Sequence, residues 1–204
     1  METKILQVFS DYVCPWCYLG QARLKKAIRD YNIKIEIIHF PLHPDTPKNG
    51  RNLLELFRCT EKELDQKNLM MTKLMNIENL EYNYREYTYN SRLAQELGYW
   101  AQIKYQNQFI HDEIYKSYFK DKKNVYELEV LIGIAANADL PVEEAEEILK
   151  HRTYKEVIDK HWEFSYKTGV TGVPTYILNN SYLVGAQDEN SLHKLFQKEN
   201  IKRV

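Results

Sequence analysis

Strand-like sequence patterns stand only near the two ends of this chain, and the long middle part carries helical patterns. Residues 5–9 form a short apolar run, and residues 33–37 alternate between isoleucine and charged side chains, as strands do. The segment between them, from Pro15 to about Tyr31, is compatible with a helix. A strand, a crossover helix and a second strand within so few residues predict a βαβ unit with a parallel strand pair.

The middle of the chain is expected to be helical throughout. Residues 51–140 contain no proline, and apolar residues recur there at helical spacing. Three prolines crowd into residues 41–47, just before this stretch, and mark an ordered loop and a boundary. Further helices are expected over residues 142–150 and 154–168.

The hydrophobic period changes back near the C-terminus. Residues 175–178 and 182–184 have the pattern of two strands, and Asn179-Asn180 between them suits a tight hairpin because Asn tolerates positive φ. A last helix is expected over residues 191–199. This order of elements predicts an α/β fold, a thioredoxin-like domain interrupted by an all-helical insertion. The expected boundaries are 1–48 and 151–204 for the thioredoxin-like domain and 49–150 for the insertion.

Composition excludes several classes of protein. The 204 residues are 44% hydrophobic and 28% charged, so the chain can bury a substantial core and is not expected to be disordered. Its formal net charge of −1 offers no basic field for nucleic acid or a membrane surface, and no long apolar run predicts a membrane span. The N-terminal sequence lacks the features of a secretory signal, so we expect a cytoplasmic protein.

Two of the three cysteines, Cys14 and Cys17, stand directly after the first strand pattern with Pro15 and Trp16 between them. Proline suits the first position of a helix, where no amide hydrogen is needed. Cys14 then takes the N-cap position, where free amides and the helix dipole favour a thiolate. Cys17, one turn later, can resolve a mixed disulfide formed at Cys14. The motif Cys14-Pro15-Trp16-Cys17 therefore predicts a catalytic nucleophile and a catalytic resolving thiol.

Two other interpretations fit this pair less well. A zinc site needs about four ligands, and the sequence has neither a second C-x-x-C nor a close Cys/His pair, so no metal is expected. Inert core cysteines would not account for the strand–Cys–Pro–helix context. Asp11 either influences the thiols or forms a hydrogen bond within the loop. Cys59 is expected to be a partly buried helix residue, and its role is left open.

A second candidate element is the segment Gly169–Thr175, which precedes the last hairpin. Pro174 stands just before a strand pattern, where a cis peptide bond after Val173 is a candidate. An ordinary proline at the start of a strand is the alternative. A cis bond would expose the carbonyl and amide of Val173 at a strand edge, where an extended substrate can pair with them. Val173 and Pro174 are therefore the predicted substrate-binding residues.

Both elements together resemble a known family. Residues 10–20, which include Cys14-Pro15-Trp16-Cys17, closely resemble the active-site region of DsbA-family thiol–disulfide oxidoreductases of the FrnE-like branch. Residues 169–175 resemble that family's cis-proline loop, and residues 89–94 and 182–187 resemble two weaker family elements. The resemblance covers essentially the whole chain. It implies that Cys14 attacks, Cys17 resolves and Pro174 is the cis-proline.

The sequence also departs from relatives of this family. Secreted members often carry His at the position of Trp16, and an indole has no positive charge to stabilise a thiolate. We therefore expect a less oxidising couple, mostly in the dithiol form in a reducing cytosol. The family also resembles kappa-class glutathione transferases and 2-hydroxychromene-2-carboxylate isomerases, which typically place Ser at the position of Cys14. Both thiols are present here, which favours disulfide exchange.

The sequence therefore predicts a cytoplasmic protein-disulfide oxidoreductase or isomerase with a dithiol mechanism. Its expected partners are protein or small-molecule thiols and disulfides. No cofactor is expected beyond the redox-active Cys14–Cys17 couple, with glutathione as an alternative co-substrate. Two alternatives stay open: a glutathione-dependent transferase or isomerase of the kappa-class type, and a non-catalytic peptide-binding module or chaperone. The substrate, the electron partner, the net direction, the reduction potential and the oligomeric state are left undetermined.

Overall fold

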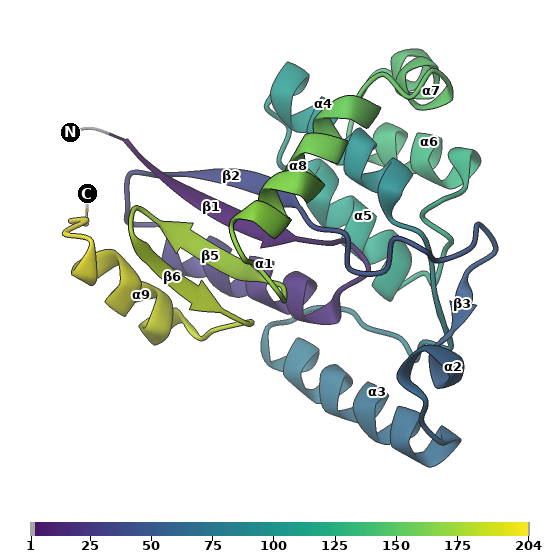
Figure 1. Ribbon diagram of the computed structural model, residues 1–204, viewed down its shortest axis with the longest axis horizontal. Coiled ribbons are helices and arrows are strands. Elements are labelled where there is room, and N and C mark those ends of the chain that lie inside the picture. Colours follow the sequence, from purple (N-terminus) through teal and green to yellow (C-terminus); the bar gives the residue numbers. More distant parts are fainter. Residues whose placement is uncertain (1–2, 204) are drawn as a thin grey trace. The chain divides into compact units, whose positions relative to one another are not determined.

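The computed structural model describes residues 3–203 and divides into two compact units (Figure 1). The first unit contains the chain up to Leu42 and again from Lys160 onward, and the second unit is His43–Asp159. Because the second unit interrupts the first in sequence, the predicted class, a thioredoxin-like α/β domain with a helical insertion, is confirmed. In the described part of the chain, no helix is both long and apolar enough to cross a membrane.

A four-stranded sheet forms the centre of the first unit, with the strand order β2-β1-β5-β6. Strand β1 (Lys4–Ser10) pairs in parallel with β2 (Ile33–His39), and helix α1 (Pro15–Ala27) connects them. Strand β5 (Thr175–Leu178) lies antiparallel to β1, and β6 (Ser181–Val184) lies antiparallel to β5. The predicted βαβ unit and C-terminal hairpin are both present, and Asn179 takes the positive φ that the hairpin requires.

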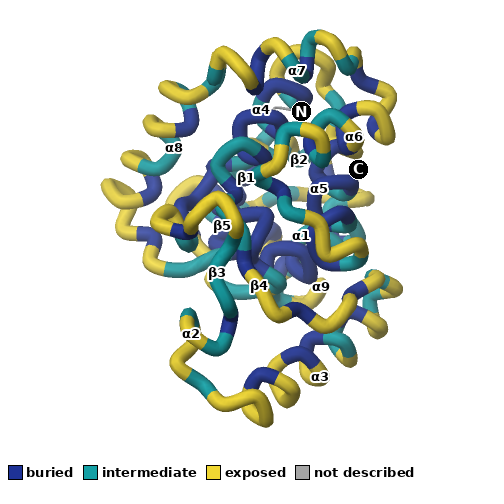
Figure 2. Tube along the Cα trace, turned by 90° about the vertical axis from the view of Figure 1, so that its right-hand side faces the viewer, coloured by how far each residue is buried: buried dark blue, intermediate teal, exposed yellow. Residues whose placement is uncertain are grey.

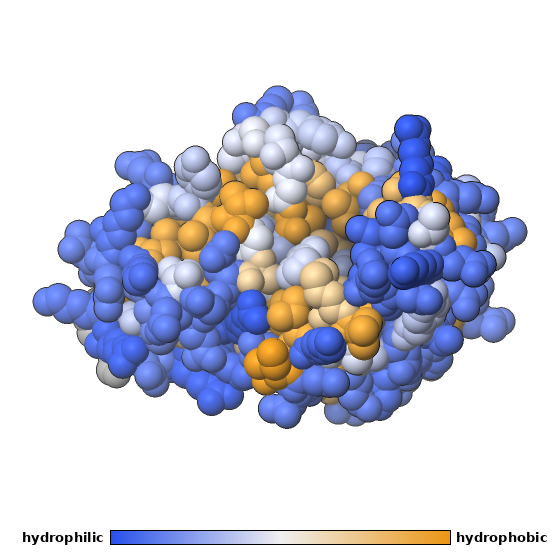
Figure 3. Space-filling model, turned by 90° about the horizontal axis from the view of Figure 1, so that it is seen from below, coloured by the Kyte–Doolittle hydropathy of each residue, from blue (hydrophilic) through white to orange (hydrophobic). Residues whose placement is uncertain are grey.

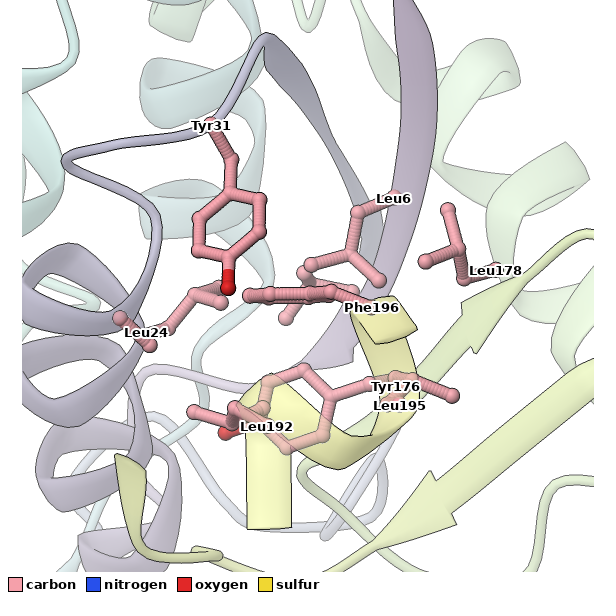
Figure 4. Close-up of a cluster of buried hydrophobic side chains, with 10 residues drawn as sticks. Leu6, Leu24, Tyr31, Tyr176, Leu178, Leu192, Leu195 and Phe196 are labelled. Carbon is pink, nitrogen blue, oxygen red and sulfur yellow. The ribbon is translucent and has the colours of Figure 1, made fainter. Parts of the chain in front are cut away.

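One face of this sheet carries the main hydrophobic core of the first unit. Leu6 and Val8 of β1, two residues apart, point to the same face and pack with side chains of α1 and of α9 (Glu189–Lys198) (Figure 4). Phe196 of α9 is fully buried and meets the ring of Tyr31 edge-on at a centroid distance of 5.0 Å. Each such side chain contributes about 1.5–3 kcal/mol by burial, which holds α9 against the sheet.

Phe9 of β1 points to the opposite face and starts a smaller cluster with Ile38, Phe40 and Val170. Its ring stacks on Phe164 at a centroid distance of 5.9 Å. Phe164 lies in α8 (Lys155–Lys167), in the part of that helix that belongs to the first unit. Because successive side chains of β1 point to opposite faces, Leu6 and Val8 are buried on one face of the sheet and Phe9 is buried on the other.

The second unit is built from helices, as predicted, with one exception described below. Its helices are α2 (Leu53–Phe57), α3 (Glu61–Ile77), α4 (Arg92–Tyr105), α5 (Phe109–Phe119), α6 (Leu128–Asn137) and α7 (Val142–Lys150). Helices α4 to α7 pack against one another around fully buried residues such as Leu97, Trp100, Ile114 and Leu131. Figure 2 shows α4 and α5 mostly buried, whereas buried and exposed residues alternate along α3, as is typical of an amphipathic helix.

The prediction of helix throughout residues 51–140 is wrong for residues 78–91. This segment contains no helix, and Tyr87–Thr88 (β4) pairs antiparallel with Arg51–Asn52 (β3). The reason lies in α3, where the buried side chain of Asn68 holds the backbone of Arg85. Asn68 Nδ2 donates to the Arg85 carbonyl (3.1 Å), and Asn68 Oδ1 accepts from the Arg85 amide (3.2 Å). The Asn68 side chain thus forms the two hydrogen bonds with the Arg85 backbone that a neighbouring strand would otherwise form.

The division into units falls after Leu42 and Asp159, whereas the sequence suggested boundaries after residues 48 and 150. Hydrogen bonds within the second unit explain the difference. Asn90 Nδ2 donates to the carbonyls of Pro44 and Thr46, which ties the proline-rich loop to the start of α4. At the other boundary, Arg92 donates to the Lys155 carbonyl in the first turn of α8 (2.7 Å).

Apolar side chains come to the surface in several places, as one face of the molecule shows in orange (Figure 3). Exposed examples in the first unit are Trp16, Tyr182 and Val184. Exposed apolar side chains of this kind are ordinary on folded proteins and are not by themselves a site.

Candidate active site

Cys14 occupies the N-cap of α1, and Pro15 is the first residue of the helix, as the sequence predicted. The Cys14 backbone is extended (φ −90°, ψ 114°), and its carbonyl accepts from the amides of Cys17 (3.0 Å) and Tyr18 (3.2 Å). The chain therefore turns into the helix at Cys14. This turn places Cys14 at the positive end of the α1 dipole, where its side chain forms no capping hydrogen bond with the first-turn amides.

Both thiols are free and almost fully buried, with 3% of Cys14 and 1% of Cys17 exposed. Burial raises the pKa of Cys17 well above its ordinary value, and a hydrogen bond to the Cys14 sulfur raises it further. At neutral pH Cys17 therefore stays protonated.

The Pro174 loop meets Cys14 directly. The Val173–Pro174 peptide bond is cis, and the Cys14 thiol donates to the Val173 carbonyl with Sγ and O 3.5 Å apart. The strand register brings these distant residues together, because Thr175 of β5 pairs with Phe9 at the end of β1. The Pro174 carbonyl accepts from the Gly185 amide (2.7 Å), which fixes the loop from its other side.

The backbone amide of Val173 is available for a further hydrogen bond. In the part of the chain that the structure describes, its amide donates no hydrogen bond, whereas its carbonyl faces the Cys14 thiol. A cavity of about 320 Å³ adjoins this loop, with Gly172 and Thr175 in its lining. Its other walls come from the segment before Gly172 and from the hairpin of β5 and β6.

Asp11 fixes the loop between β1 and α1. Its carboxylate, 1% exposed, accepts from the amide of Val13 (3.2 Å) and from the amide of Leu42 (3.0 Å). Of the two roles considered for Asp11, the loop hydrogen bond is therefore present. Because Leu42 follows β2, this carboxylate joins the loop that carries Cys14 to the end of the neighbouring strand.

Two residues of the site were not selected from the sequence. A side chain at Gly20, in α1, would collide with the Tyr176 hydroxyl and press on the Pro174 ring. The Tyr176 hydroxyl is buried and has no hydrogen-bond partner among the described residues. A glycine inside a helix is a signal of close packing, but only the fold shows which residues approach it.

The remaining predicted residues lie as follows. Trp16, between the two cysteines, is 38% exposed, so its indole is accessible beside the motif. Cys59 is partly exposed, but it lies between α2 and α3 rather than within a helix, because Arg58 ends α2 in the left-handed conformation. Among the described residues, no group of three or more His, Cys, Asp or Glu side chains could hold a metal ion.

One family model matches most of this chain. The model of the DSBA-like thioredoxin domain matches residues 5–197, which include both cysteines and Pro174. It spans most of the chain, insertion included.

Solved structures with the same fold come from several organisms. The crystal structure of a probable DsbA oxidoreductase from Streptomyces coelicolor, SCO1869, has a TM-score of 0.89 and 23% identity, covering 98% of this chain and 92% of that one. A 2-hydroxychromene-2-carboxylate isomerase has a TM-score of 0.70 and 18% identity, covering 96% of this chain and 94% of that one. The cytosolic disulfide reductase DsbM of Pseudomonas aeruginosa, in a structure with GSH, has a TM-score of 0.68 and 12% identity, covering 96% and 99%. At these identities, each likeness concerns the fold.

Proposed function

The chain belongs to the DSBA-like thioredoxin domain family, and from that premise we propose that it is a cytoplasmic thiol–disulfide oxidoreductase acting through Cys14 and Cys17. The observation that carries the proposal is the position of the pair. Cys14 caps α1 with its thiol against the Val173 carbonyl, and Cys17 stands one turn behind it with a raised pKa. This arrangement separates an attacking thiol from a resolving thiol.

The first step is attack of the Cys14 thiolate on a substrate disulfide. One S–S bond breaks, one substrate sulfur leaves as a thiolate, and the other forms a mixed disulfide with Cys14. Cys14 is the proposed attacking residue because it is the N-cap of α1 and its sulfur faces the Pro174 loop. During this step Cys17 remains a thiol, because burial keeps its pKa high.

The second step resolves the mixed disulfide. Cys17 loses its proton and attacks the Cys14 sulfur, which forms the Cys14–Cys17 disulfide and releases the second substrate thiolate. The substrate has then gained two electrons and the enzyme has lost two. A thiol reductant restores the dithiol by the reverse exchange, and glutathione is the reductant that we propose.

The substrate is proposed to approach along the Pro174 loop. The free Val173 amide can donate to a carbonyl of an extended chain, as an edge strand does. The cavity beside this loop is lined by neutral residues, among them Thr171, Asn180 and Tyr182. We therefore propose an uncharged peptide segment, flanking the substrate disulfide, as its occupant.

Reduction is the proposed net direction. Trp16 supplies no positive charge beside Cys14, so the thiolate lacks the cation that would make the couple strongly oxidising. The similar DsbM is a cytosolic disulfide reductase whose structure was determined with GSH. Cytoplasmic location and membership of the FrnE-like branch remain predictions from the sequence.

The decisive experiment is to trap the first intermediate. Replacing Cys17 with Ser removes the resolving thiol and keeps Cys14, so mixed disulfides with substrate should accumulate on Cys14 and disappear on adding reductant. Incubation with a cytosolic extract, followed by mass spectrometry of the Cys14 peptide, detects them. Cys59→Ser is the matched control, because it removes a thiol outside the motif and should trap nothing.

The same variant tests the second candidate function, a glutathione-dependent transferase or isomerase. The likeness to the 2-hydroxychromene-2-carboxylate isomerase favours that candidate. Cys17 has no covalent role in such a mechanism. If Cys17→Ser protein conjugates or isomerises with glutathione as fast as the wild type and carries no reducible adduct on Cys14, the oxidoreductase proposal is wrong.

A further inference from the structure

The second unit contains a buried positive charge that disulfide exchange does not use. Arg85, in the extended segment between α3 and α4, is only 7% exposed. Its guanidinium donates from Nε to the Tyr82 hydroxyl (3.1 Å) and from Nη1 to the Tyr118 hydroxyl (2.8 Å). The rings of Tyr82, Tyr118 and Phe119 lie around it at 5.0–5.6 Å from the guanidinium carbon. The head group is thus held in a fixed position.

Within the described part of the chain, no carboxylate neutralises this charge. The Tyr82 hydroxyl gives its own proton to Asn68 Oδ1 (3.0 Å), and the Tyr118 hydroxyl gives its proton to the Tyr87 carbonyl (3.1 Å). Neither phenol therefore has a negative charge to offer. Within residues 3–203, no carboxylate forms an ion pair with Arg85. A buried charge without an ionic partner is rare and costly, so its presence calls for a reason.

The electrostatics of a neighbouring residue agree with an unneutralised Arg85. His43, partly buried in the same unit, has a lowered pKa, first because of burial and then because of the positive charges of Arg51 and Arg85. Arg85 is thus close enough to His43 for its positive charge to act on that ring.

Arg85 is one of the residues that line a cavity of about 200 Å³, together with Tyr118, whose hydroxyl accepts from its guanidinium. Three tyrosines, Tyr87, Tyr89 and Tyr118, form walls of the cavity, and Lys122 adds a second positive charge. Glu86 also lines the cavity, but its side chain is exposed to solvent, which screens its charge more than that of the buried Arg85. Arg85 and Lys122 together outweigh the single carboxylate.

We propose that this cavity is a binding site for a small oxyanion, a carboxylate or a phosphate group, with Arg85 as its principal ligand. Two of the Arg85 nitrogens carry the hydrogen bonds described above, and Nη2 has none within the described chain. A guanidinium can donate two parallel hydrogen bonds to such a group. The tyrosine rings can pack against an apolar or aromatic body attached to the anion.

Inorganic phosphate and acetate serve as separate probes for the two anion sources. Each is titrated into the full-length protein while the Arg85 side-chain Nε–H signal is followed by NMR, assigned by its absence in Arg85→Lys. We expect a saturable shift of this signal with at least one probe. Saturation with phosphate alone identifies a phosphate site, and saturation with acetate alone identifies a carboxylate site.

A charge reversal at the cavity provides the sharper test. Lys122→Glu places a carboxylate in the lining, where it competes with the probe for Arg85, and should raise the dissociation constant by at least about tenfold. Lys123→Glu is the matched control: it makes the same change in net charge at an exposed neighbour that does not line the cavity. Its dissociation constant should change less than about twofold, by screened long-range repulsion alone.

Two results would overturn the proposal. One is the absence of a saturable Arg85 shift with either probe. The other is equal weakening by Lys122→Glu and Lys123→Glu, which would mean that the anion responds only to overall charge. Both lysines are exposed, so neither substitution removes a buried contact. Urea denaturation followed by circular dichroism gives an independent measure of folding, and the midpoint should be unchanged in both variants.

Discussion

Gly20 is the residue that lets α1 approach the loop carrying Pro174. A methyl group at this position would collide with the Tyr176 hydroxyl and press on the Pro174 ring at 3.0 Å. We expect Gly20→Ala to lower the free energy of unfolding by about 1–3 kcal/mol, the usual effect of overpacking a core. Urea denaturation followed by circular dichroism measures it.

Gly133 gives the matched control, since it is also a helical glycine but has no heavy atom within 4 Å of an added methyl group. Gly133→Ala should raise the free energy of unfolding by up to about 1 kcal/mol, because alanine is the better helix former. Tyr176→Phe removes the colliding oxygen and should recover part of the loss in a Gly20→Ala background. Equal effects of the two glycine substitutions would contradict a specific contact at Gly20.

The parts of this site that could be predicted from the sequence are those formed by residues close together in the chain. Cys14, Pro15 and Cys17 form one helix start, and its geometry follows from residue type alone. The partners of Asp11 and Gly20 depend on which strands become neighbours. No spacing in the sequence encodes the approach of Leu42 to Asp11, so those roles required the fold.

Among the elements, α4 is joined to the turn after α7 by a buried carboxylate. Glu96 of α4 is fully buried and accepts from Arg152 through both of its oxygens, at 2.6–3.2 Å, and from Arg92 at 3.1 Å. Glu96→Gln keeps the shape but removes the charge between two arginines. We expect a loss of about 2–3 kcal/mol in the free energy of unfolding, as for other broken buried ion pairs.

Glu146→Gln is the corresponding surface substitution. Glu146 pairs with Lys150 one turn along α7, and both side chains are exposed. Its replacement should not change the denaturation midpoint measurably, because solvent screens such pairs. If Glu96→Gln also leaves the denaturation midpoint unchanged in the same urea titration, the buried network does not hold α4 in place.

The type of each element could be predicted where one hydrophobic period dominates the sequence. The prediction failed where side chains, rather than a neighbouring strand or helical turn, form hydrogen bonds with the backbone. Helices α7 and α8 lie close to their expected ranges. Residues 78–91 were misassigned because absence of proline permits a helix without requiring one. The Asn68 side chain, which satisfies the Arg85 backbone, comes from a separate helix. Helix α9 begins two residues earlier than expected, because the Asp188 side chain caps it by accepting from the Ser191 amide.

At the scale of the whole molecule, the central sheet joins segments that are far apart in sequence. Strand β1 pairs with β2 across a single helix, but its other neighbour, β5, begins only at Thr175. The complete second unit lies between these partners in the chain. Local patterns therefore predicted each strand of this sheet, and the position of Pro174 beside Cys14 follows from a pairing that only tertiary structure determines.

Acid sensitivity should arise from a histidine behind the β2 strand. His161 Nδ1 accepts from the His39 backbone amide (3.2 Å), and its ring lies 5.7 Å from the His39 ring. Burial lowers the pKa of His161, and Glu36 opposes that shift. The unfolded chain, with an ordinary histidine pKa of about 6.5, therefore binds a proton more readily than the folded protein. The resulting stabilisation is complete above that pH and is lost as pH falls toward the lowered folded-state pKa.

Urea titrations at pH 7.5 and pH 5.5 measure this loss. Between these two pH values, a histidine with a lowered folded-state pKa can lower the free energy of unfolding by at most about 1.4 kcal/mol, and by less where the ring is partly exposed. His161→Gln retains an acceptor for the His39 amide but cannot titrate, so its loss of stability between the two pH values should be smaller than that of the wild type. His43, whose pKa is also lowered, accounts for part of the remainder. His151 is exposed, and His151→Gln should therefore follow the wild type. If His161→Gln loses as much stability as the wild type on acidification, the buried ring is not the group that responds to pH.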